Sequence, residues 1–406
     1  MRKPYLKSNW AITVFTAITV TVSQFSVILF TPSLPNLVSD FNTSTGMIQF
    51  TIAIFLLMFG VSCLFYGPLS DHYGRRNLIV FALFFMLLGT AIILLSTTIW
   101  GFFIGRILQG LGAGGPSVIM RAVLRDRYEA HQMGKVMASR ITIIGFAPLI
   151  APLLGGYLQS WFGWRGAFYF LFFYILHMLL LVYLLLPETN VNRRKHEFSF
   201  KVVMANYRKV LSHKVYLCFI LSILLAYNCQ IAYLTIGPFV FQKRLMLTPE
   251  EYGQIILLPA LCFLLGGILS RFLFRFMKGL YQILIGIILL FVTGVGWMIM
   301  IQINFFSIAS TIIPLMMAQI VIALVFSNAT AGMLKPFPSL SGTAAAFSSF
   351  IQMFGNGMLG SLISYLHLTT SKGISTFFII NSLLLFVLFM GIKKFKRSKD
   401  YIKIVQ

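Results

Sequence analysis

The residues with the most specific spacing lie in one short segment, Gly67-Pro-Leu-Ser-Asp71-His-Tyr-Gly74-Arg75-Arg76. Asp71 can cap a neighbouring helix or pair with an arginine, and Gly74 permits a tight turn. Gly67 allows another helix to approach closely, while Arg75 and Arg76 hold the loop beside a membrane face. Such a loop could act as a charge latch that breaks when two helices separate.

A second set of polar residues lies inside apolar segments, where a polar side chain is costly and by default indicates a function. Arg106 is followed one helical turn later by Gln109, on the same face. We expect this pair to serve a central cavity; the alternative is that Arg106 extends to the membrane interface. The other polar candidates, each of which could instead form a hydrogen bond between helices, are Gln24, Tyr227, Asn228, Tyr233 and Gln319.

Acidic residues are missing from the apolar segments. All nine fall in predicted loops, the linker or the tail, although proton-coupled membrane sites usually contain a titratable group. His177 is the remaining intramembrane candidate, and we favour a structural role for it. The four cysteines lie in apolar runs without CxxC spacing, and neither HExxH nor a converging Ser/His/Asp set occurs. We therefore predict no catalytic residues, no metal site and no cofactor.

The composition predicts that these residues are positioned by membrane-spanning helices. Hydrophobic residues make up 58% of the 406, charged residues only 10%, and the mean hydropathy is +0.89, which is too little polar surface for a soluble protein. The net charge of +23 comes from short basic clusters between apolar runs, a pattern that orients membrane helices and does not indicate nucleic-acid binding. Gly110 to Gly115 match G-x-G-x-x-G, but within a membrane helix these glycines indicate close helix packing.

The sequence contains about twelve apolar runs that are long enough to cross a membrane. We interpret the first as a retained span rather than a signal peptide. The predicted spans are 11–33, 47–69, 77–97, 100–120, 136–158, 165–187, 214–238, 252–274, 280–301, 308–330, 342–365 and 373–393.

The connecting segments predict the orientation and the domains. Most of the 32 basic residues fall on one side, so the positive-inside rule predicts cytoplasmic termini. The longest connector divides the chain into an N-terminal six-helix bundle (1–187), a cytoplasmic linker (188–213) and a C-terminal six-helix bundle (214–406). Gly67, Asp71 and Arg75 recur as Gly267, Arg271 and Arg275 after the eighth span, as a parallel repeat requires.

The fifth span contains a predicted helix bend. Its Gly145, Pro148 and Pro152 are followed by paired glycines, Gly155 and Gly156. Prolines bend a helix and glycines let a neighbour approach closely. Helix packing and a gating bend both explain this pattern.

The segment from Gly67 to Arg76 closely resembles the G-x-x-x-D-x-x-G-R-R/K loop of the major facilitator superfamily. Further segments resemble its Bcr/CflA drug-resistance branch, and they extend over nearly the whole chain: Thr31-Pro-Ser-Leu-Pro35, Arg106-Ile-Leu-Gln-Gly110, Arg121-Ala-Val-Leu-Arg125-Asp126, Pro148 to Gly156, and Pro336-Phe-Pro338 with Ser341-Gly-Thr-Ala344. The resemblance implies two pseudo-symmetric six-helix bundles around a cavity lined by spans one, four, seven and ten. This is an all-α polytopic fold.

The resemblance also implies a secondary transporter of the bacterial inner membrane, a monomer in the lipid bilayer, that exports drugs or small organic molecules and uses protons. One departure from the pattern of this branch supports an alternative transport function. Members of this branch carry an Asp four residues before the first proline of the Thr31–Pro35 segment, where this chain has Ile28. A cavity with Arg106 and no acid favours a carrier for a specific anionic or zwitterionic metabolite or siderophore, with a different coupling ion or none.

Overall fold

The computed structural model describes residues 9–129, 131–190, 200–334, 336–337 and 341–396, and within these ranges it contains helices and turns without any strand. The predicted all-α fold is confirmed. The helices are α1 (Asn9–Ile28), η1 (Thr31–Ser33), α2 (Leu34–Asp40), α3 (Thr45–Tyr73), α4 (Arg75–Leu95), α5 (Ile99–Arg127), α6 (Met133–Gly145), α7 (Ala147–Phe162), α8 (Trp164–Leu185), α9 (Phe200–Leu211), α10 (Lys214–Phe239), η2 (Val240–Arg244), α11 (Pro249–Ile255), α12 (Leu257–Leu273), α13 (Gly279–Gln302), α14 (Ile308–Leu334), α15 (Ser341–Tyr365) and α16 (Ser371–Lys396).

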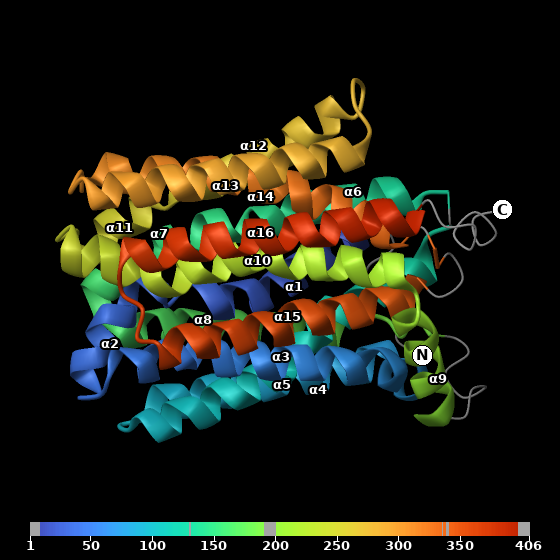
Figure 1. The fold of residues 1–406 in the computed structure, drawn as a ribbon. Coiled ribbons are helices and arrows are strands. Elements are labelled where there is room, and N and C mark those ends of the chain that lie inside the picture. The colour runs from blue at the N-terminus through green and yellow to red at the C-terminus, as the bar shows by residue number, and fades with distance from the viewer. Residues whose placement is uncertain (1–8, 130, 191–199, 335, 338–340, 397–406) are drawn as a thin grey trace.

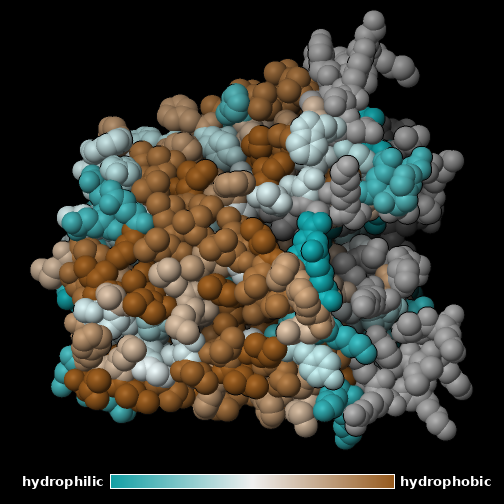
Figure 2. Space-filling view, turned by 90° about the horizontal axis from the view of Figure 1, so that it is seen from above, coloured by the Kyte–Doolittle hydropathy of each residue, from teal (hydrophilic) through white to brown (hydrophobic). Residues whose placement is uncertain are grey.

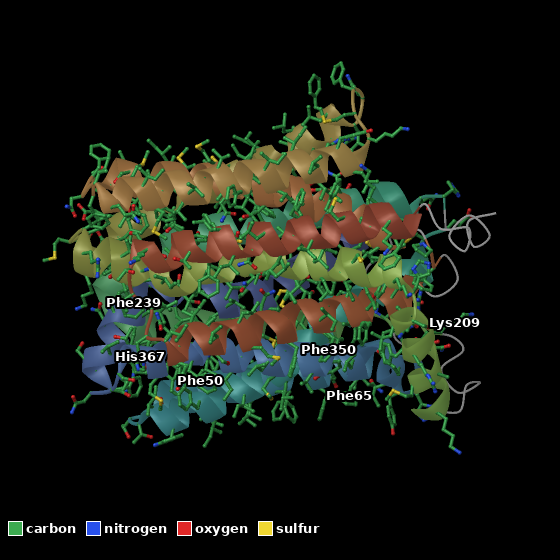
Figure 3. The ribbon with its side chains drawn as sticks, in the orientation of Figure 1. Phe50, Phe65, Lys209, Phe239, Phe350 and His367 are labelled. Atoms are coloured by element: carbon green, nitrogen blue, oxygen red, sulfur yellow. The ribbon has the colours of Figure 1, made fainter. Side chains whose placement is uncertain are left out.

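The long helices lie side by side in one bundle with two distinct ends (Figure 1). At one end are α2 and α11, and we call it the α11 end. At the other are α9 and the last turns of α16, and we call it the α9 end. Figure 3 places Lys209 at the α9 end, and Phe239 and His367 at the α11 end.

Eleven helical segments of the described chain are long and apolar enough to cross a membrane. The 25-residue α15 is not among them, because its Ser and Gly residues, together with Gln352 and Asn356, lower its hydropathy. It nevertheless lies in the bundle and packs along α3. With α15, the described residues contain the twelve predicted spans.

The surface of the bundle is apolar between its ends. Figure 2 shows hydrophobic residues over most of the visible face, with hydrophilic residues gathered toward the two ends. Large side chains on α4, such as Phe81, Phe84 and Leu95, are more than half exposed. In water such a surface would aggregate, whereas lipid tails solvate it.

Two predicted spans are interrupted: the break in the fifth span lies where a bend was expected, whereas the break in the eighth corrects its description as a continuous helix. The span predicted at 136–158 is divided into α6 and α7 at Phe146, and the span predicted at 252–274 into α11 and α12 at Ile256. Pro148 and Pro259 follow these breaks. A proline has no N–H to donate to the preceding turn and its ring clashes with that turn, so a helix bends just before it.

The first span is also shorter than predicted. The helix α1 ends at Ile28, and Pro32 then lies in a separate 3-10 turn that leads into α2. Because Pro32 and Pro35 cannot donate backbone hydrogen bonds, the chain forms short turns here in place of a continuous helix.

Candidate functional site

Arg75 is the centre of the charged loop between α3 and α4. Its side chain is 3% exposed and lies 2.6 Å from Asp71 and 3.1 Å from Asp126 of α5, and it also donates to the hydroxyl of Ser70. Gly74, with a φ of 95°, makes the turn that ends α3 and begins α4, a conformation that costs little only for glycine. One guanidinium therefore joins α3, α4 and α5.

Glu188, which follows α8, holds the first turn of α4. Its carboxylate oxygens accept hydrogen bonds from the backbone N–H groups of Arg75 (3.0 Å) and Arg76 (3.3 Å). These N–H groups have no partner within the helix, and a carboxylate also complements the positive end of the helix dipole. Arg76 lies over the ring of Tyr183 and donates to its carbonyl oxygen. The charged loop is thus joined to α8 as well.

The described contacts of this loop stay among helices of the first half of the chain. Gly67 faces Val118 of α5, as expected for a glycine at a close helix contact. Asp71 pairs within its own loop, and its side chain remains 53% exposed. The predicted carboxylate–guanidinium pair is therefore present, but the acid that links two helices is Asp126, whose side chain is 18% exposed.

Arg106 is completely buried between α1, α3 and α5. Its Nη1 donates to the carbonyl of Ser26 (2.8 Å) and to Oε1 of Gln109 (2.9 Å), and its Nε donates to the carbonyl of Thr51 (3.1 Å). Gln109 donates in turn to the hydroxyl of Thr90 on α4 (2.7 Å). Ser26 lies in the last turn of α1, where carbonyl groups lack a partner within the helix.

Two aromatic rings complete the surroundings of Arg106. The guanidinium carbon lies 4.4 Å from the ring centre of Phe30 and 4.5 Å from that of Phe55, so the ring faces attract the cation in place of a carboxylate. Because Arg106 is fully buried, it does not extend to the membrane interface. In this conformation it contacts protein groups, and it connects the four helices α1, α3, α4 and α5.

The remaining polar candidates do not form one cluster of hydrogen bonds. Asn228 donates to Asn381 of α16 (3.1 Å), a contact between helices. Gln319 is 1% exposed and neither atom of its amide has a partner. Tyr233 is also buried, whereas Gln24 and Tyr227 remain partly exposed.

The paired glycines of α7 contact two different parts of the chain. A Cβ on Gly155 would collide with the carbonyl of Leu29, in the first half. A Cβ on Gly156 would collide with the backbone of Pro249 in α11, in the second half. Gly253 of α11 faces the carbonyl of Pro152 in the same way. α7 therefore packs backbone to backbone against α11, while α6, beyond the bend at Gly145 and Pro148, packs mainly against α1.

A hydrogen bond and a cleft also link the two halves at the α11 end. Gln242 of η2, which is 9% exposed, donates to the carbonyl of Pro32 (2.8 Å). A cleft of about 370 Å³ lies beside it, lined by Pro35 from the first half and by Phe239, Lys243 and Arg244 from the second.

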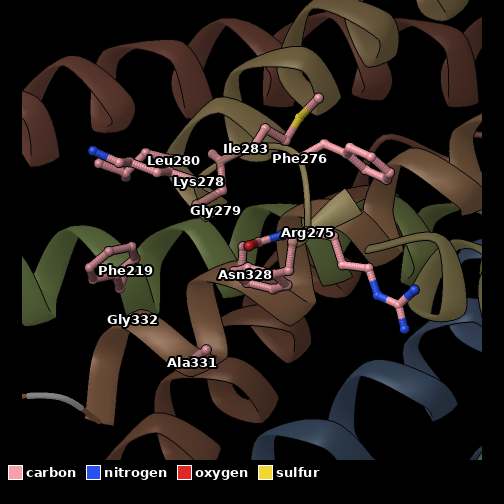
Figure 4. A pocket seen from close by; sticks show the side chains of 12 residues that line it. Phe219, Arg275, Phe276, Lys278, Gly279, Leu280, Ile283, Asn328, Ala331 and Gly332 are labelled. Atoms are coloured by element: carbon pink, nitrogen blue, oxygen red, sulfur yellow. The ribbon is translucent and has the colours of Figure 1, made fainter. Parts of the chain in front are cut away.

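The second copy of the repeat lies beside a larger pocket at the α9 end (Figure 4). This pocket, of about 580 Å³, is formed by the connection between α12 and α13 together with α10 and α14. Arg275 and Lys278 line it, and no acidic residue does. Arg75 in the first copy has two carboxylate partners, whereas no ion pair of Arg275 is found in the described chain.

The linker helix α9 connects the halves at the α9 end. The hydroxyl of Tyr207 donates to the carbonyl of Leu64 on α3 (3.1 Å), and its ring packs 5.6 Å from that of Phe347 on α15. Burial raises the pKa of Tyr207 to about 12. The phenol therefore stays protonated and keeps its donor at physiological pH.

Titratable groups give no coupling site among the described residues. Ile28 is 3% exposed, and the described acids lie at the two ends of the bundle. His177 is exposed on the same face of α8 as Phe173 and Leu180, so it faces lipid. Within the part of the chain that the structure describes, no group of three His, Cys, Asp or Glu residues could hold a metal ion.

The sequence analysis gave no structural or functional role to four residues that make important contacts or are buried in the structure, although Asp126 belongs to one of the quoted motifs. Glu188 and Asp126 bind the charged loop, Gln242 links the halves, and Arg140 is 5% exposed within α6. Arg140 could have been found, because it falls inside the apolar run 136–158, where an arginine is costly. The other three lie near span ends, where a polar residue is ordinary.

A family model of the Major Facilitator Superfamily matches residues 16–361. Among curated relatives, Multidrug resistance protein D of Escherichia coli is 26% identical, over 86% of each chain. The Bicyclomycin resistance protein homolog of Haemophilus influenzae is 24% identical, over 86% of this chain and 87% of that one. These matches confirm the resemblance to the drug-resistance branch.

Solved structures show the same fold. The inward-open xylose transporter of E. coli has a TM-score of 0.72 at 16% identity, with 93% of this chain and 96% of that chain covered. A crystal structure of a D-xylose–proton symporter has a TM-score of 0.71, also at 16% identity, and covers 93% of this chain and 97% of that one.

Proposed function

Because the chain belongs to the Major Facilitator Superfamily, it is a membrane transporter and not an enzyme, and we propose that it exports drugs or other small organic molecules by proton-driven alternating access. The relatives named for multidrug and bicyclomycin resistance support export. A third, the Chloramphenicol resistance protein CraA of Acinetobacter baumannii, is 27% identical over 55% of this chain.

The proposed moving parts are the two bundles, residues 1–187 and 214–406, joined by the linker 188–213. The observation that carries this mechanism is the backbone contact of α7 with α11, in which Gly156 and Gly253 remove the side chains between the bundles. Such a contact can form and separate as a rigid surface. The bend at Gly145 and Pro148 would let α7 tilt relative to α6 within the first bundle as this contact separates.

The proposed orientation places the α9 end in the cytoplasm and the α11 end outside, in a bacterial inner membrane, with the protein acting as a monomer. The linker helix α9, with Arg208 and Lys209 in its last turn, and the last turns of α16 lie at the α9 end, as the positive-inside rule requires. The charged loop around Arg75 would then stabilise the cytoplasmic side of the first bundle.

A second candidate is a carrier for a specific anionic or zwitterionic metabolite or siderophore, with another coupling ion or none. It is favoured by the same observation that argues against cation export: Ile28 is buried where the branch has an Asp, and no described acid lies at membrane depth. Without a carboxylate, a cationic drug has no counter-charge in the bundle.

The test is compound retention in a bacterial host that lacks its own efflux pumps. Neutral, cationic and anionic compounds are loaded, with and without an uncoupler, and wild type is compared with Asp71→Asn. Uncoupler-sensitive loss of a compound that slows in Asp71→Asn supports proton-driven export. Retention of every compound, with the protein present in the membrane, contradicts drug export and leaves the dedicated carrier.

A further inference from the structure

The first residues of α13 line the larger pocket at the α9 end (Figure 4). Gly279 and Leu280 begin this helix, and the backbone N–H groups of a first helical turn have no acceptor within the helix. Among the described residues no side chain caps them, and the first turn contains no acidic residue. These N–H groups and the positive end of the helix dipole together favour a negatively charged group at this place.

The corresponding helix of the first bundle shows how such a place is occupied. α4 begins at the first copy of the repeat, and the carboxylate of Glu188 accepts hydrogen bonds from the backbone N–H groups of Arg75 and Arg76. α13 follows the second copy, in which Arg271 stands in place of Asp71. Here the described chain supplies no carboxylate to the first turn, and a pocket of about 580 Å³ lies beside it.

Two cations flank the start of α13. Arg275 and Lys278 line the pocket, and Figure 4 shows the ends of their side chains on opposite sides of Gly279. In the described chain neither forms an ion pair. The guanidinium carbon of Arg275 lies 6.0 Å from the ring centre of Phe272, at the outer limit of a cation–π contact. Both side chains are exposed, so they can turn toward an anion at the start of the helix.

Asn328 adds an acceptor that the described chain leaves unpaired. It lines the pocket and is 5% exposed, and a Cβ on Gly279 would collide with its Oδ1. Its Nδ2 donates to the carbonyl of Leu324 (2.8 Å), which can only accept and therefore fixes the orientation of the amide. Oδ1 thus lies against the start of α13 without a hydrogen-bond partner. A bare anion cannot satisfy it, because a carbonyl oxygen needs a donor.

The surface around the pocket favours a lipid over a soluble anion. Phe274 and Phe276 also line the pocket, and they are 51% and 70% exposed. Aromatic rings and basic side chains at the end of a membrane helix lie at the level of the lipid headgroups. A phospholipid bound there places its phosphate at the helix start and its acyl chains along these rings. Basic pockets between membrane helices bind anionic headgroups in this way.

We propose that the pocket at the start of α13 binds the headgroup of an anionic phospholipid that carries a hydroxyl group, as phosphatidylglycerol does. The phosphate accepts from the first N–H groups of α13 and from Arg275 and Lys278, in the place that Glu188 occupies on α4. The headgroup hydroxyl donates to Oδ1 of Asn328. An ammonium headgroup is disfavoured, because the two cations repel it. This lipid site does not depend on which substrate the protein transports.

The affinity for phosphatidylglycerol is measured by native mass spectrometry of the full-length protein in detergent, with phosphatidylcholine as the reference lipid. We expect Arg275→Gln and Lys278→Gln each to weaken it about fivefold, the contribution of one basic residue near a headgroup. Arg271→Gln is the matched control and should keep the wild-type affinity, because Arg271 is exposed nearby but is not part of the pocket lining. An equal loss in all three variants shows that net positive charge alone attracts the lipid, and overturns the proposal.

Thermal unfolding in phosphatidylcholine separates a binding role from a structural one. All three variants should keep the wild-type Tm, because neither Arg275 nor Lys278 forms an ion pair in the described chain. A lower Tm for Arg275→Gln or Lys278→Gln, with an unchanged Tm for Arg271→Gln, shows that the protein itself already engages these side chains and overturns the proposal.

Lipid analogues test the headgroup. Phosphatidylmethanol is an anionic phosphodiester without a hydroxyl group, so we expect it to bind about fivefold more weakly than phosphatidylglycerol, the value of one hydrogen bond. Phosphatidylethanolamine should bind no better than phosphatidylcholine. Equal affinity for phosphatidylmethanol and phosphatidylglycerol overturns the role of Asn328, and tight binding of phosphatidylethanolamine overturns the selection of an anion. If soluble glycerol 1-phosphate binds as tightly as phosphatidylglycerol, the ligand is a soluble phosphate ester and the lipid proposal is wrong.

The chain's own acids are the last alternative occupant. Glu197 and Asp400 lie outside the described residues. In the double variant Glu197→Gln/Asp400→Asn these two carboxylates can no longer compete for the pocket, and we expect its affinity for phosphatidylglycerol to equal that of wild type. Clearly tighter binding by the double variant shows that one of these carboxylates occupies the site in the native protein, and overturns the proposal.

Discussion

Buried arginines are held in different ways in this bundle, and the difference sets what each substitution should cost. Arg75 is neutralised by carboxylates, and Arg106 by carbonyl groups and aromatic rings. Arg140 is 5% exposed, and its Nε has no described partner. Arg75 and Arg106 are built to hold helices together.

The two partners of Arg75 should differ in importance. Asp71 is 53% exposed and Asp126 is 18% exposed. We expect Asp71→Asn to cost at most about 0.5 kcal/mol of unfolding free energy, as for an exposed pair. Asp126→Asn should cost about 1–3 kcal/mol, because it leaves a buried guanidinium with fewer acceptors. Thermal unfolding of the purified variants measures both, and an equal loss would contradict the assignment of Asp126 as the main partner.

Arg106 should not tolerate lysine. Its donors point in several directions, to Ser26, Thr51 and Gln109, and an ammonium on a flexible stem cannot reach all three. We expect Arg106→Lys to lower stability by about 3 kcal/mol, with Tm and membrane abundance as the measurements. The matched change Arg271→Lys, at an exposed position, should leave both unchanged. Wild-type stability in Arg106→Lys would show that charge alone is sufficient.

At the scale of the helices, proline and glycine decide where spans bend and touch. The pattern from Gly145 to Gly156 predicted a bend and close packing, and the break at Phe146 fits it. The matching break before Pro259 was not predicted, because a single proline in an apolar run is a weak signal. Nor could the sequence say that Gly155 and Gly156 face different halves, because that depends on tertiary packing.

Substitutions of Gly155 and Gly156 should therefore have different effects. Gly156→Leu would place a side chain against Pro249 of the other half, so we expect normal insertion and Tm but at least tenfold slower export. Gly155→Leu would collide with Leu29 inside its own half and should lower Tm, because overpacking typically costs about 1–3 kcal/mol. Gly296→Leu is the control, since nothing lies within 4 Å of its added Cβ. Equal phenotypes for Gly155→Leu and Gly156→Leu would contradict these separate roles.

For the whole molecule, the sequence was sufficient to predict the twelve spans and the family, because hydropathy and the loop from Gly67 to Arg76 are local signals. It was not sufficient to predict the contacts around Arg106. Ser26, Thr51 and Thr90 surround Arg106 through their place in three other helices, and no spacing along the chain reveals that. In this structure Arg106 is enclosed by protein groups, and its expected role in the cavity stays a prediction.

The hydrogen bond from Gln242 to Pro32 should bias the whole molecule toward closure at the α11 end. It is buried and joins the two halves, so its loss by Gln242→Leu should cost about 1 kcal/mol and lower the ratio of closed to open molecules about fivefold. Dyes at Asn42→Cys and Met246→Cys, exposed on opposite halves, report this ratio by single-molecule fluorescence transfer, because the four native cysteines are buried.

Gln254→Leu is the matched control for that measurement. Gln254 also bridges the halves, by donating to Tyr157 (2.9 Å), but its hydrogen bond is exposed. Water can replace an exposed bond at little cost, whereas a buried carbonyl at Pro32 would be left without a donor. We therefore expect a clearly smaller shift for Gln254→Leu. If Gln242→Leu leaves the closed fraction unchanged, the packing of α7 on α11 holds this end shut by itself, and the bond only aligns the two halves.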